Sequence, residues 1–416
     1  MGACLAELPR VVITGMAGLC PLGNDWPAVS QSLESNTSGV QYMQDWDRFA
    51  DMNTRLAAPL ASFELPPSYT RKKTRSMGRV SLLAVRASEL ALQDAGLLDG
   101  EPINDGRTGV AYGSSSGCTQ AINEFTNLLS GNGLKGLNST SYLRMMPHTT
   151  AASISMYFGF KGRVIPTSSA CVSGSQGIGY AYEAIRYGRV ERMVAGGAEG
   201  LCPSQAAVFD TLYATSTKND TPTLSPAPFD AHRDGLVIGE GACSFVLESL
   251  DAARQRGATI HAEIVGYGSN SDGAHATRPN SETMAESMRL ALRDAGLDAE
   301  QIDFVCAHAT ATEHGDIAEC EATQAVLGRK PTASYKGHMG HTLGACGALE
   351  SWFAIEMMKQ GRFAPTLNLQ QLDPRCEGLD FLQGEMREIP AQYVMNNNFA
   401  FGGVNTSLIY RAWNEA

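Results

Sequence analysis

One cysteine of this chain stands in surroundings that favour a reactive thiol. Cys171 lies in the run TSSACVSGSQGIGYAYEAIRYG at 167–188, where small residues precede it and a long helical pattern follows. This predicts a tight strand-to-helix bend, where the N–H groups and the dipole of the helix N-terminus stabilise a thiolate. The backbone N–H of Cys171 can also donate to the oxyanion formed when a thioester is attacked. The alternative is that Cys171 is a small buried core residue, as most of the ten cysteines should be.

A histidine and two threonines form the next candidate group. His308 ends the apolar run IDFVCAH at 302–308, and the residues after it include Thr310 and Thr312. A polar cluster at the end of a buried strand is where an α/β fold places its site. Thr310 and Thr312 point the same way if the backbone is extended, and can then hydrogen-bond a linear, amide-rich ligand. A pair of threonines serving a turn or a helix cap is an equal alternative.

A glycine-rich segment supplies a second histidine and a lysine. Lys336 and His341 lie in SYKGHMGHTLGACG at 334–347, just before a helical pattern. His338 and His341 have a spacing that can suit a metal ion, but no third ligand at metal-site spacing accompanies them. We therefore expect no metal site.

The segment NNNFAFGGVN at 396–405 is the last candidate. Gly402 and Gly403 permit a backbone that approaches a ligand closely. Phe399 and Phe401 are either core aromatics or gates of a site.

The elements that position these residues repeat along the chain. LALQDAGL at 90–97 matches LALRDAGL at 290–297, and AYEAIRYGR at 181–189 resembles AIEMMKQGR at 354–362. Each segment closes a predicted helix before a glycine. Apolar, β-branched runs alternate with these helices and predict buried strands. The predicted strands are Arg10–Gly15, Thr108–Gly113, Ala262–Gly266 and Ile302–His308.

These repeats indicate one α/β unit that is duplicated. The spacings of the two pairs differ, so a short-period solenoid is excluded. The expected halves are residues 1–255 and 256–416, with the main insertion of the first half around 114–165. The polar, proline-rich stretch 215–228 is expected to be a loop.

Composition excludes several classes of protein. The chain has 416 residues and a formal net charge of −11, which argues against broad nucleic-acid binding. It has no run of about 18 apolar residues and no signal peptide, so we expect a cytoplasmic protein without a membrane-spanning segment. The glycines at 174, 177 and 179 have the order G-x-x-G-x-G, which suits close helix packing better than a dinucleotide fingerprint.

Together these motifs resemble the β-ketoacyl-acyl-carrier-protein synthases of type II fatty-acid and polyketide synthesis, within the thiolase-like superfamily. The resemblance covers nearly the whole chain. It implies a duplicated five-layer α/β/α/β/α fold, which agrees with the repeats. Six ordered segments carry it: RVVITGMAGLCPLG at 10–23, SSACVSGSQGIGYA at 168–181, PFDAHRDGLVIGEGA at 228–242, HATATEHGDIAE at 308–319, KGHMGHTLGACG at 336–347 and NNNFAFGGVNTSLIY at 396–410.

The resemblance also implies roles for individual residues. Cys171 would accept the acyl group from a carrier-protein thioester, and His308 and His341 would assist malonyl decarboxylation as neutral N–H donors. Decarboxylation drives the bond formation, so no cofactor or metal is needed. The remaining implied roles are a supporting lysine at Lys336 with Glu319 as its acidic partner, an oxyanion N–H and a gate at Phe401, and binding of the phosphopantetheine arm by Thr310 and Thr312.

Some positions depart from the family pattern. Glu313-His314 replaces a proline and a small residue, and Cys346 and Val172 replace small residues. Ser116 stands where some relatives carry a bulky residue that closes the acyl pocket, which predicts a deeper or differently shaped pocket. These differences favour a specialised branch, such as aryl-polyene or other polyketide synthesis.

The expected partner is an acidic acyl carrier protein. RKKTRSMGR at 71–79 holds five basic residues and no acid, and can steer such a partner. The alternative is a solvated helix face. Family similarity favours Lys72 and Arg75 as docking contacts. The resemblance further implies a homodimer, or a heterodimer with a chain-length-factor homologue, and leaves a coenzyme A-dependent thiolase-like enzyme as the competing class.

Overall fold

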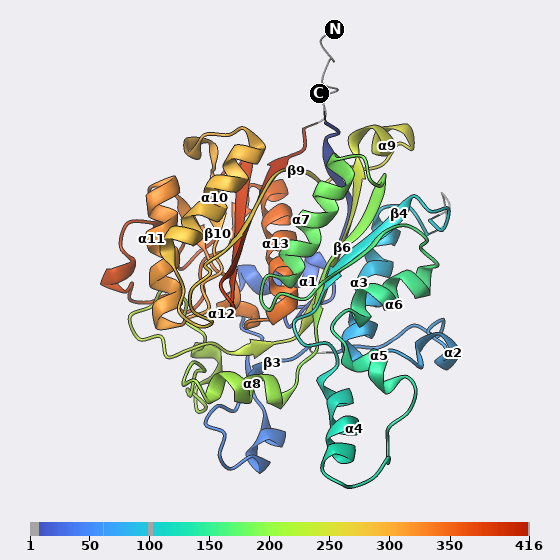
Figure 1. Cartoon of the computed structure of the whole chain (residues 1–416). Coiled ribbons are helices and arrows are strands. Elements are labelled where there is room, and N and C mark those ends of the chain that lie inside the picture. Colours follow the sequence, from blue (N-terminus) through green and yellow to red (C-terminus); the bar gives the residue numbers. More distant parts are fainter. Residues whose placement is uncertain (1–7, 61, 99–102, 415–416) are drawn as a thin grey trace.

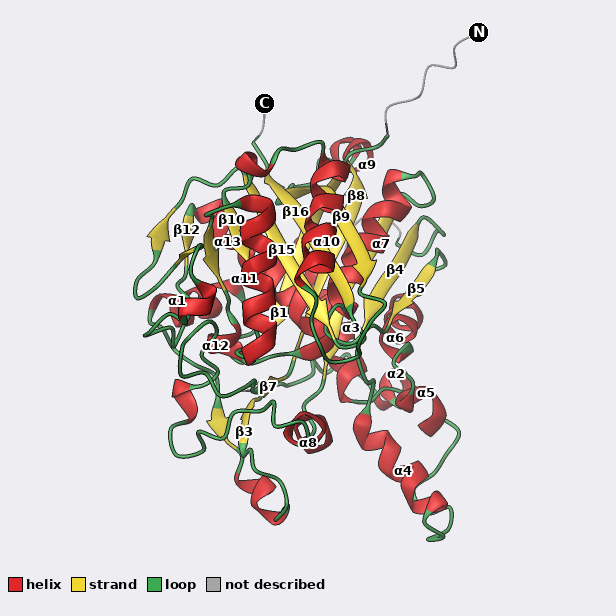
Figure 2. Ribbon diagram, turned by 60° about the vertical axis from the view of Figure 1, so that its left-hand side comes forward, coloured by secondary structure: helices red, strands yellow, loops and turns green. Residues whose placement is uncertain are grey.

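A computed structural model describes residues 8–60, 62–98 and 103–414, in which eleven strands form one large sheet with two similar halves, beside two small sheets of three and two strands (Figures 1 and 2). In the first half the strand order is β1-β8-β6-β4-β5, and in the second it is β9-β16-β15-β10-β11, with β13 outside β11. The bounds are β1 Val11–Leu19, β8 Gly241–Ser249, β6 Arg192–Glu199, β4 Thr108–Gly113, β5 Val164–Thr167, β9 Ala262–Ser271, β16 Val404–Ala412, β15 Tyr393–Ala400, β10 Phe304–Cys306, β11 Pro331–Ala333 and β13 Asp380–Phe381.

The two halves repeat the same strand directions. In each, the first two pairings are antiparallel and the next two are parallel. The halves meet where β1 pairs antiparallel with β9, at Val11 opposite Ile264 and the two pairs beside it. The two halves therefore have the same strand order and the same strand directions, which is the duplication that the repeated segments predict.

Helices complete a five-layer arrangement. α7 Ser173–Arg186 and α13 Cys346–Gln360 lie in the middle and contact strands of both halves (Figure 1). α3 Arg79–Asp94 and α6 Thr149–Phe158 cover the outer face of the first half. α10 Ser281–Ala295 and α11 Glu313–Leu327 cover that of the second (Figure 2). The thiolase-like α/β/α/β/α fold is therefore confirmed.

The repeated segments end equivalent helices, as predicted. The DAGL segments close α3 and α10, and both Gly96 and Gly296 take a left-handed backbone conformation. The second pair closes α7 and α13, the two central helices. The central layer is tightly packed, because a Cβ on Gly177 would lie 2.8 Å from the carbonyl oxygens of Ala111 and Gly196. Close packing thus explains the glycines of α7.

The segment 114–165 contains three helices with different surroundings. α4 Thr119–Leu129 and α5 Ser141–Met145 extend away from the layered body (Figures 1 and 2). α6 packs against α3 and β4, so it is part of the outer layer. The remaining α-helices and strands are α1 Trp26–Glu34, α2 Arg71–Thr74, α8 Pro203–Asp210, α9 Leu250–Gln255, α12 Lys336–Met339, β2 Gln41–Tyr42, β3 Leu56–Ala58, β7 Ile238–Gly239, β12 Arg362–Phe363 and β14 Arg387–Glu388.

The four predicted strands are present; β4 has the predicted bounds, and the other three have shifted ends. β1 runs on to Leu19, whereas β10 is limited to Phe304–Cys306 and leaves His308 in the segment that follows. In the part of the chain that the structure describes, no helix has the length and apolar character needed to cross a bilayer.

Candidate active site

Cys171 lies on the bend between β5 and α7. β5 ends at Thr167 and α7 begins at Ser173, and between them Ala170 has a left-handed φ of 50°. The Ser173 hydroxyl fixes this bend, since it donates to the Ala170 carbonyl at 2.6 Å and accepts from the Ser169 N–H at 2.9 Å. The Cys346 thiol donates to the Cys171 carbonyl at 3.3 Å. The predicted strand-to-helix bend is therefore present, and Cys171 is buried at the end of the central helix.

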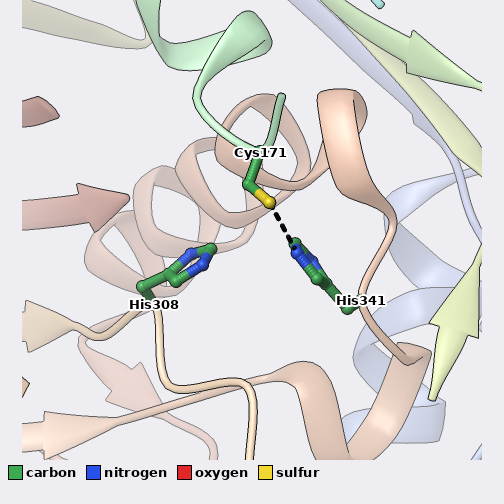
Figure 3. A group of neighbouring side chains, drawn as sticks. All are labelled: Cys171, His308 and His341. Carbon is green, nitrogen blue, oxygen red and sulfur yellow. Dashed lines mark hydrogen bonds between the residues drawn. The ribbon is translucent and has the colours of Figure 1, made fainter. Parts of the chain in front are cut away.

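His341 is hydrogen-bonded to the sulfur of Cys171. Its Nε2 lies 3.0 Å from Sγ (Figure 3). The backbone of His341 is held from both sides, because its N–H donates to the Val237 carbonyl at 2.7 Å and its carbonyl accepts from Gly239 at 2.9 Å. Nδ1 of His341 has no hydrogen-bond partner among the residues described. The protein thus fixes the position of this ring, but no partner at Nδ1 decides which of the two ring nitrogens carries the proton.

His308 faces the same sulfur from the other side. Its ring centre lies 5.2 Å from that of His341, nearly perpendicular to it (Figure 3). Two donors approach its Nδ1, the Lys336 ammonium at 3.4 Å and the Asn398 amide at 3.4 Å. Because Nδ1 must then accept, the proton of the neutral ring sits on Nε2. His308 therefore offers an N–H donor to the site.

The acidic partner of Lys336 is Glu350, and not Glu319 as the family resemblance implied. Lys336 and Glu350 form an ion pair whose two side chains are fully buried. Burial opposes the charged lysine, but Glu350 outweighs it and raises the pKa of Lys336 above its ordinary value. Asn398 donates to the other oxygen of Glu350 at 2.7 Å. Glu350 therefore orients both donors that face His308.

Glu319 has a different position. Its two carboxyl oxygens accept the backbone N–H groups of His308 and Ala309, each at 2.7 Å. Burial raises its pKa to about 8. Glu319 therefore holds the backbone from which His308 projects, and does not contact Lys336 through a hydrogen bond or ion pair in the described parts of the chain.

The electrostatics of the site favour neutral rings. Burial and the Lys336 ammonium hold the pKa values of His308 and His341 well below 6.5, so both imidazoles are neutral near pH 7. Burial also raises the pKa of the Cys171 thiol to about 11, although Lys336 and two backbone N–H groups act in the opposite direction. The expected resting thiolate is therefore wrong: desolvation outweighs the helix N-terminus, and the sulfur must lose its proton during the reaction.

Two backbone N–H groups converge on the sulfur. Those of Cys171 and Phe401 face Sγ and act to lower the pKa of the thiol. This is the arrangement expected of an oxyanion hole. The Phe401 ring is partly exposed and packs on Phe209 with ring centres 5.0 Å apart, whereas Phe399 is buried against His308. Gly402 continues the chain with a left-handed φ of 87°.

A cavity of about 520 Å³ leads to these groups, and Cys171, His308, His341, Phe399 and Phe401 line it. Thr310 and Thr312 line it as well, with their hydroxyl oxygens 3.0 Å apart. Thr312 precedes α11 but its side chain makes no capping hydrogen bond. The two threonines therefore face the ligand space and do not cap the helix.

Ser116 does not line this cavity. Its hydroxyl donates to Glu199 at 3.0 Å and accepts from the Gln205 amide at 2.9 Å. Ser115 and Gly344 also donate to Glu199, which is fully buried. Ser116 thus belongs to a polar network at the end of β6, and its role in an acyl pocket stays a prediction.

Lys72 and Arg75 lie in and directly after α2, and both are exposed. Neither forms an ion pair with any of the residues described. They are available to an acidic partner, which is what docking requires.

His338 does not form a metal site with His341. Its two ring nitrogens lie 3.2 Å from the carbonyls of Thr37 and Pro365, so it connects loops. The ligand atoms of Cys171, His308 and His341 do lie within 4.8 Å of one another, a spacing that a metal ion can use. The hydrogen bond between Cys171 and His341 would have to break for that.

Sequence reasoning missed Glu350 and Asn398. Each had a signal: Glu350 is an acid inside the apolar helical run ALESWFAIEMM, and Asn398 belongs to three asparagines in a buried strand, where asparagine is disfavoured.

Comparison with known proteins agrees with this geometry. Residues 9–253 match the family described as "Beta-ketoacyl synthase, N-terminal domain", and residues 261–370 match "Beta-ketoacyl synthase, C-terminal domain". A curated relative, "3-oxoacyl-[acyl-carrier-protein] synthase 2" of Vibrio cholerae, is 35% identical, with 97% of this chain and 99% of the relative covered.

Two solved structures are also similar. A β-ketoacyl synthase from Burkholderia phymatum has a TM-score of 0.97 and 58% identity, covering 98% of this chain and 100% of its own. A structure titled "The ishigamide ketosynthase/chain length factor" has a TM-score of 0.88 and 30% identity, with the same coverage. The two family matches and the full-length relatives show that this chain belongs to the β-ketoacyl synthase family.

Proposed function

We propose that this enzyme joins an acyl group, carried on Cys171, to malonyl-acyl-carrier protein with loss of CO2, giving 3-oxoacyl-acyl-carrier protein. The observation that carries the proposal is the meeting of one thiol and two neutral imidazoles at the end of a ligand cavity. The name of the curated relative supports the class of reaction and of carrier.

In the first step Cys171 accepts the acyl group. Nε2 of His341, 3.0 Å away, takes the proton from Sγ as the sulfur bonds to the thioester carbon. The N–H groups of Cys171 and Phe401 stabilise the oxyanion. The bond to the carrier's sulfur then breaks, and that thiolate takes the proton from His341.

In the second step malonyl-carrier protein occupies the same cavity. The Nε2–H of His308 donates to the malonyl thioester oxygen, where charge develops as CO2 leaves. His341 can add a second N–H, since its tautomer is free. The enolate carbon bonds to the acyl carbon, the bond from that carbon to the Cys171 sulfur breaks, and the departing thiolate takes a proton from water to restore the resting thiol. No redox cofactor or metal enters these steps.

Two threonines and the basic segment at 71–79 bind the carrier protein and its arm in this scheme. Thr310 and Thr312 hold the phosphopantetheine arm within the cavity. Lys72 and Arg75 contact the acidic carrier protein. Coenzyme A-dependent condensation of the thiolase type is the competing activity.

The chain is proposed to work as a dimer. β5 is the edge strand of the sheet, and Val164 on it is 42% exposed, so this edge is suited to pairing with a second chain. Either a second copy or a non-catalytic chain-length-factor homologue can be the partner, as in the ketosynthase/chain length factor named above. Copurification from the native host distinguishes them.

Each half, 1–255 and 256–416, is proposed as one domain. The first supplies Cys171 and the second supplies both histidines, so neither is active alone. A cytoplasmic location and a role in aryl-polyene or other polyketide synthesis stay predictions from the sequence.

Reconstitution tests the proposed reaction. The enzyme is mixed with acyl-carrier protein and malonyl-carrier protein labelled at the free carboxyl. We expect release of labelled CO2 together with 3-oxoacyl-carrier protein. Condensation that proceeds equally well from acetyl-coenzyme A, with no carrier present, would support the competing thiolase-type activity.

A further inference from the structure

The outer rim of the catalytic cavity carries three side chains that the proposed steps leave unused. His275 and Arg278 lie on the loop between β9 and α10, and His314 lies in the first turn of α11. All three are exposed and line the same cavity as Cys171. His314 belongs to the Glu313-His314 pair that departs from the family pattern. The chain as a whole has more acidic than basic side chains, with a net charge of −11, so its overall composition does not explain why basic side chains gather at the mouth of this cavity.

The acids that line the same cavity near its rim are already engaged. Glu313 pairs with Arg375 at 2.7 Å, and Asp272 accepts from the Asn405 amide at 2.7 Å. Asp234 accepts from the Thr217 N–H and pairs with Lys218. By contrast, Arg278 forms no ion pair or side-chain hydrogen bond with the rest of the described chain. Its guanidinium is therefore left available for an anion that enters from outside.

One of the histidines is also oriented as a donor. The N–H of Thr277 donates to Nδ1 of His275 at 3.1 Å, so the proton of the neutral His275 ring lies on Nε2. A buried guanidinium on the cavity wall, Arg233, cannot serve the same ligand, because it is held by Asp373 and by the carbonyls of Thr312 and Glu313. The hydrogen-bond donors that remain available to an anionic ligand are therefore on the side chains at the rim of the cavity.

We propose that Arg278, assisted by His275 and His314, binds the phosphodiester of the phosphopantetheine arm as the arm enters the cavity. The inference rests on the proposed function, in which Thr310 and Thr312 hold the amide part of that arm. The phosphodiester is the only charged group of the arm and lies at its outer end, next to the carrier. A guanidinium recognises phosphate oxygens with two parallel hydrogen bonds, which suits Arg278 to this ligand.

Two alkylating probes test the inference without requiring condensation. Bromoacetyl-aminopantetheine and its 4′-phosphate both place an electrophile at the end of the arm, and differ only in the phosphate. The second-order rate constant for alkylation of Cys171 is followed by intact mass. For the wild-type protein we expect the phosphorylated probe to react about tenfold faster, the size expected for one charge-assisted contact.

The variant Arg278→Ala should lose most of that preference and react with the unphosphorylated probe at the wild-type rate. Arg329→Ala is the matched control, because Arg329 is exposed and lies after the opposite end of α11, outside the cavity lining. Equal rates for both probes with the wild-type protein, or an unchanged preference in Arg278→Ala, would overturn the inference. Either result leaves the proposed condensation untouched, since the probes react with Cys171 whether or not malonyl is decarboxylated.

Discussion

Nε2 of His341 lies 3.0 Å from Sγ of Cys171, yet the thiol is a weak acid in this setting. The two facts fit together if His341 takes the proton only as the sulfur attacks. The resting enzyme then keeps an inert thiol within reach of a neutral base, and reactivity appears when the thioester carbon is in place.

This arrangement predicts the pH dependence of Cys171 alkylation by iodoacetamide. Burial raises the pKa of the thiol to about 11, so the reactive thiolate fraction should keep increasing up to that pH. We expect an alkylation rate, measured on the peptide that contains Cys171, that still rises between about pH 8 and pH 10. A plateau already reached near neutral pH would mean a stabilised thiolate and would contradict this account.

The pH dependence of acylation by the carrier thioester should differ. Acylation needs neutral His341, whose pKa burial holds well below 6.5. The rate should therefore persist below about pH 6.5 and fall only as the pH drops through the lowered pKa of this ring. Single-turnover acylation followed from about pH 5 to pH 8 checks this. A rate that halves at or above pH 6.5 would show an unperturbed histidine.

Asn398 should affect decarboxylation more than acylation, because it helps to fix the His308 tautomer. Asn398→Leu removes one donor to Nδ1 of His308 and should slow CO2 release from malonyl-carrier protein by about 10- to 100-fold. Acylation of Cys171 should change by less than about threefold, since His341 is unaffected. Asn397→Leu is the matched control, because the neighbouring side chain on a strand points to the opposite face. Equal loss in both steps would argue against the division of roles.

The Lys336–Glu350 pair should behave as a buried ion pair. Lys336→Met leaves an unpaired buried carboxylate and should lower the free energy of unfolding by about 3–5 kcal/mol. Adding Glu350→Leu should recover most of that stability, as measured by denaturant unfolding. Activity should not return with it, because His308 still lacks its lysine donor. Full activity in the stable double variant would show that the pair serves folding alone.

Lys72 and Arg75 should act on the carrier and not on the chemistry. Reversing both charges, Lys72→Glu with Arg75→Glu, should raise KM for carrier-bound substrate by about tenfold at low salt, with kcat preserved. The effect should shrink as salt increases. Arg189→Glu with Arg329→Glu is the control, since it gives the same change in net charge at other exposed positions. An equal rise in KM in the control would assign the effect to overall charge.

The sequence was sufficient for most of the elements and for naming Cys171, His308 and His341, three side chains that the structure brings together. The paired segments at 90–97 and 290–297 end equivalent helices, and Cys171 lies on the predicted bend. Periodicity and glycine positions are local properties, so they can be recognised along the chain. The protonated state of the Cys171 thiol was not predictable in this way, because the desolvation of Cys171 depends on everything packed around it.

The acidic partner of Lys336 could not be predicted from the sequence either, because it also depends on how distant elements pack. Glu319 and Glu350 lie at similar distances from it in sequence, on different helices. Only the packing of α13 in the central layer turns Glu350 toward the lysine, while α11 in the outer layer directs Glu319 to the backbone of His308. An acid inside an apolar helix was the one available signal.

The most direct test of the central claim is the intact mass of the protein after incubation with an acyl-carrier thioester that supports turnover. The wild-type protein should gain the mass of one acyl group, located on the peptide that holds Cys171, and should lose it when malonyl-carrier protein is added. Cys171→Ala should gain nothing and form no 3-oxoacyl product. Product formation by Cys171→Ala at the wild-type rate would contradict the account.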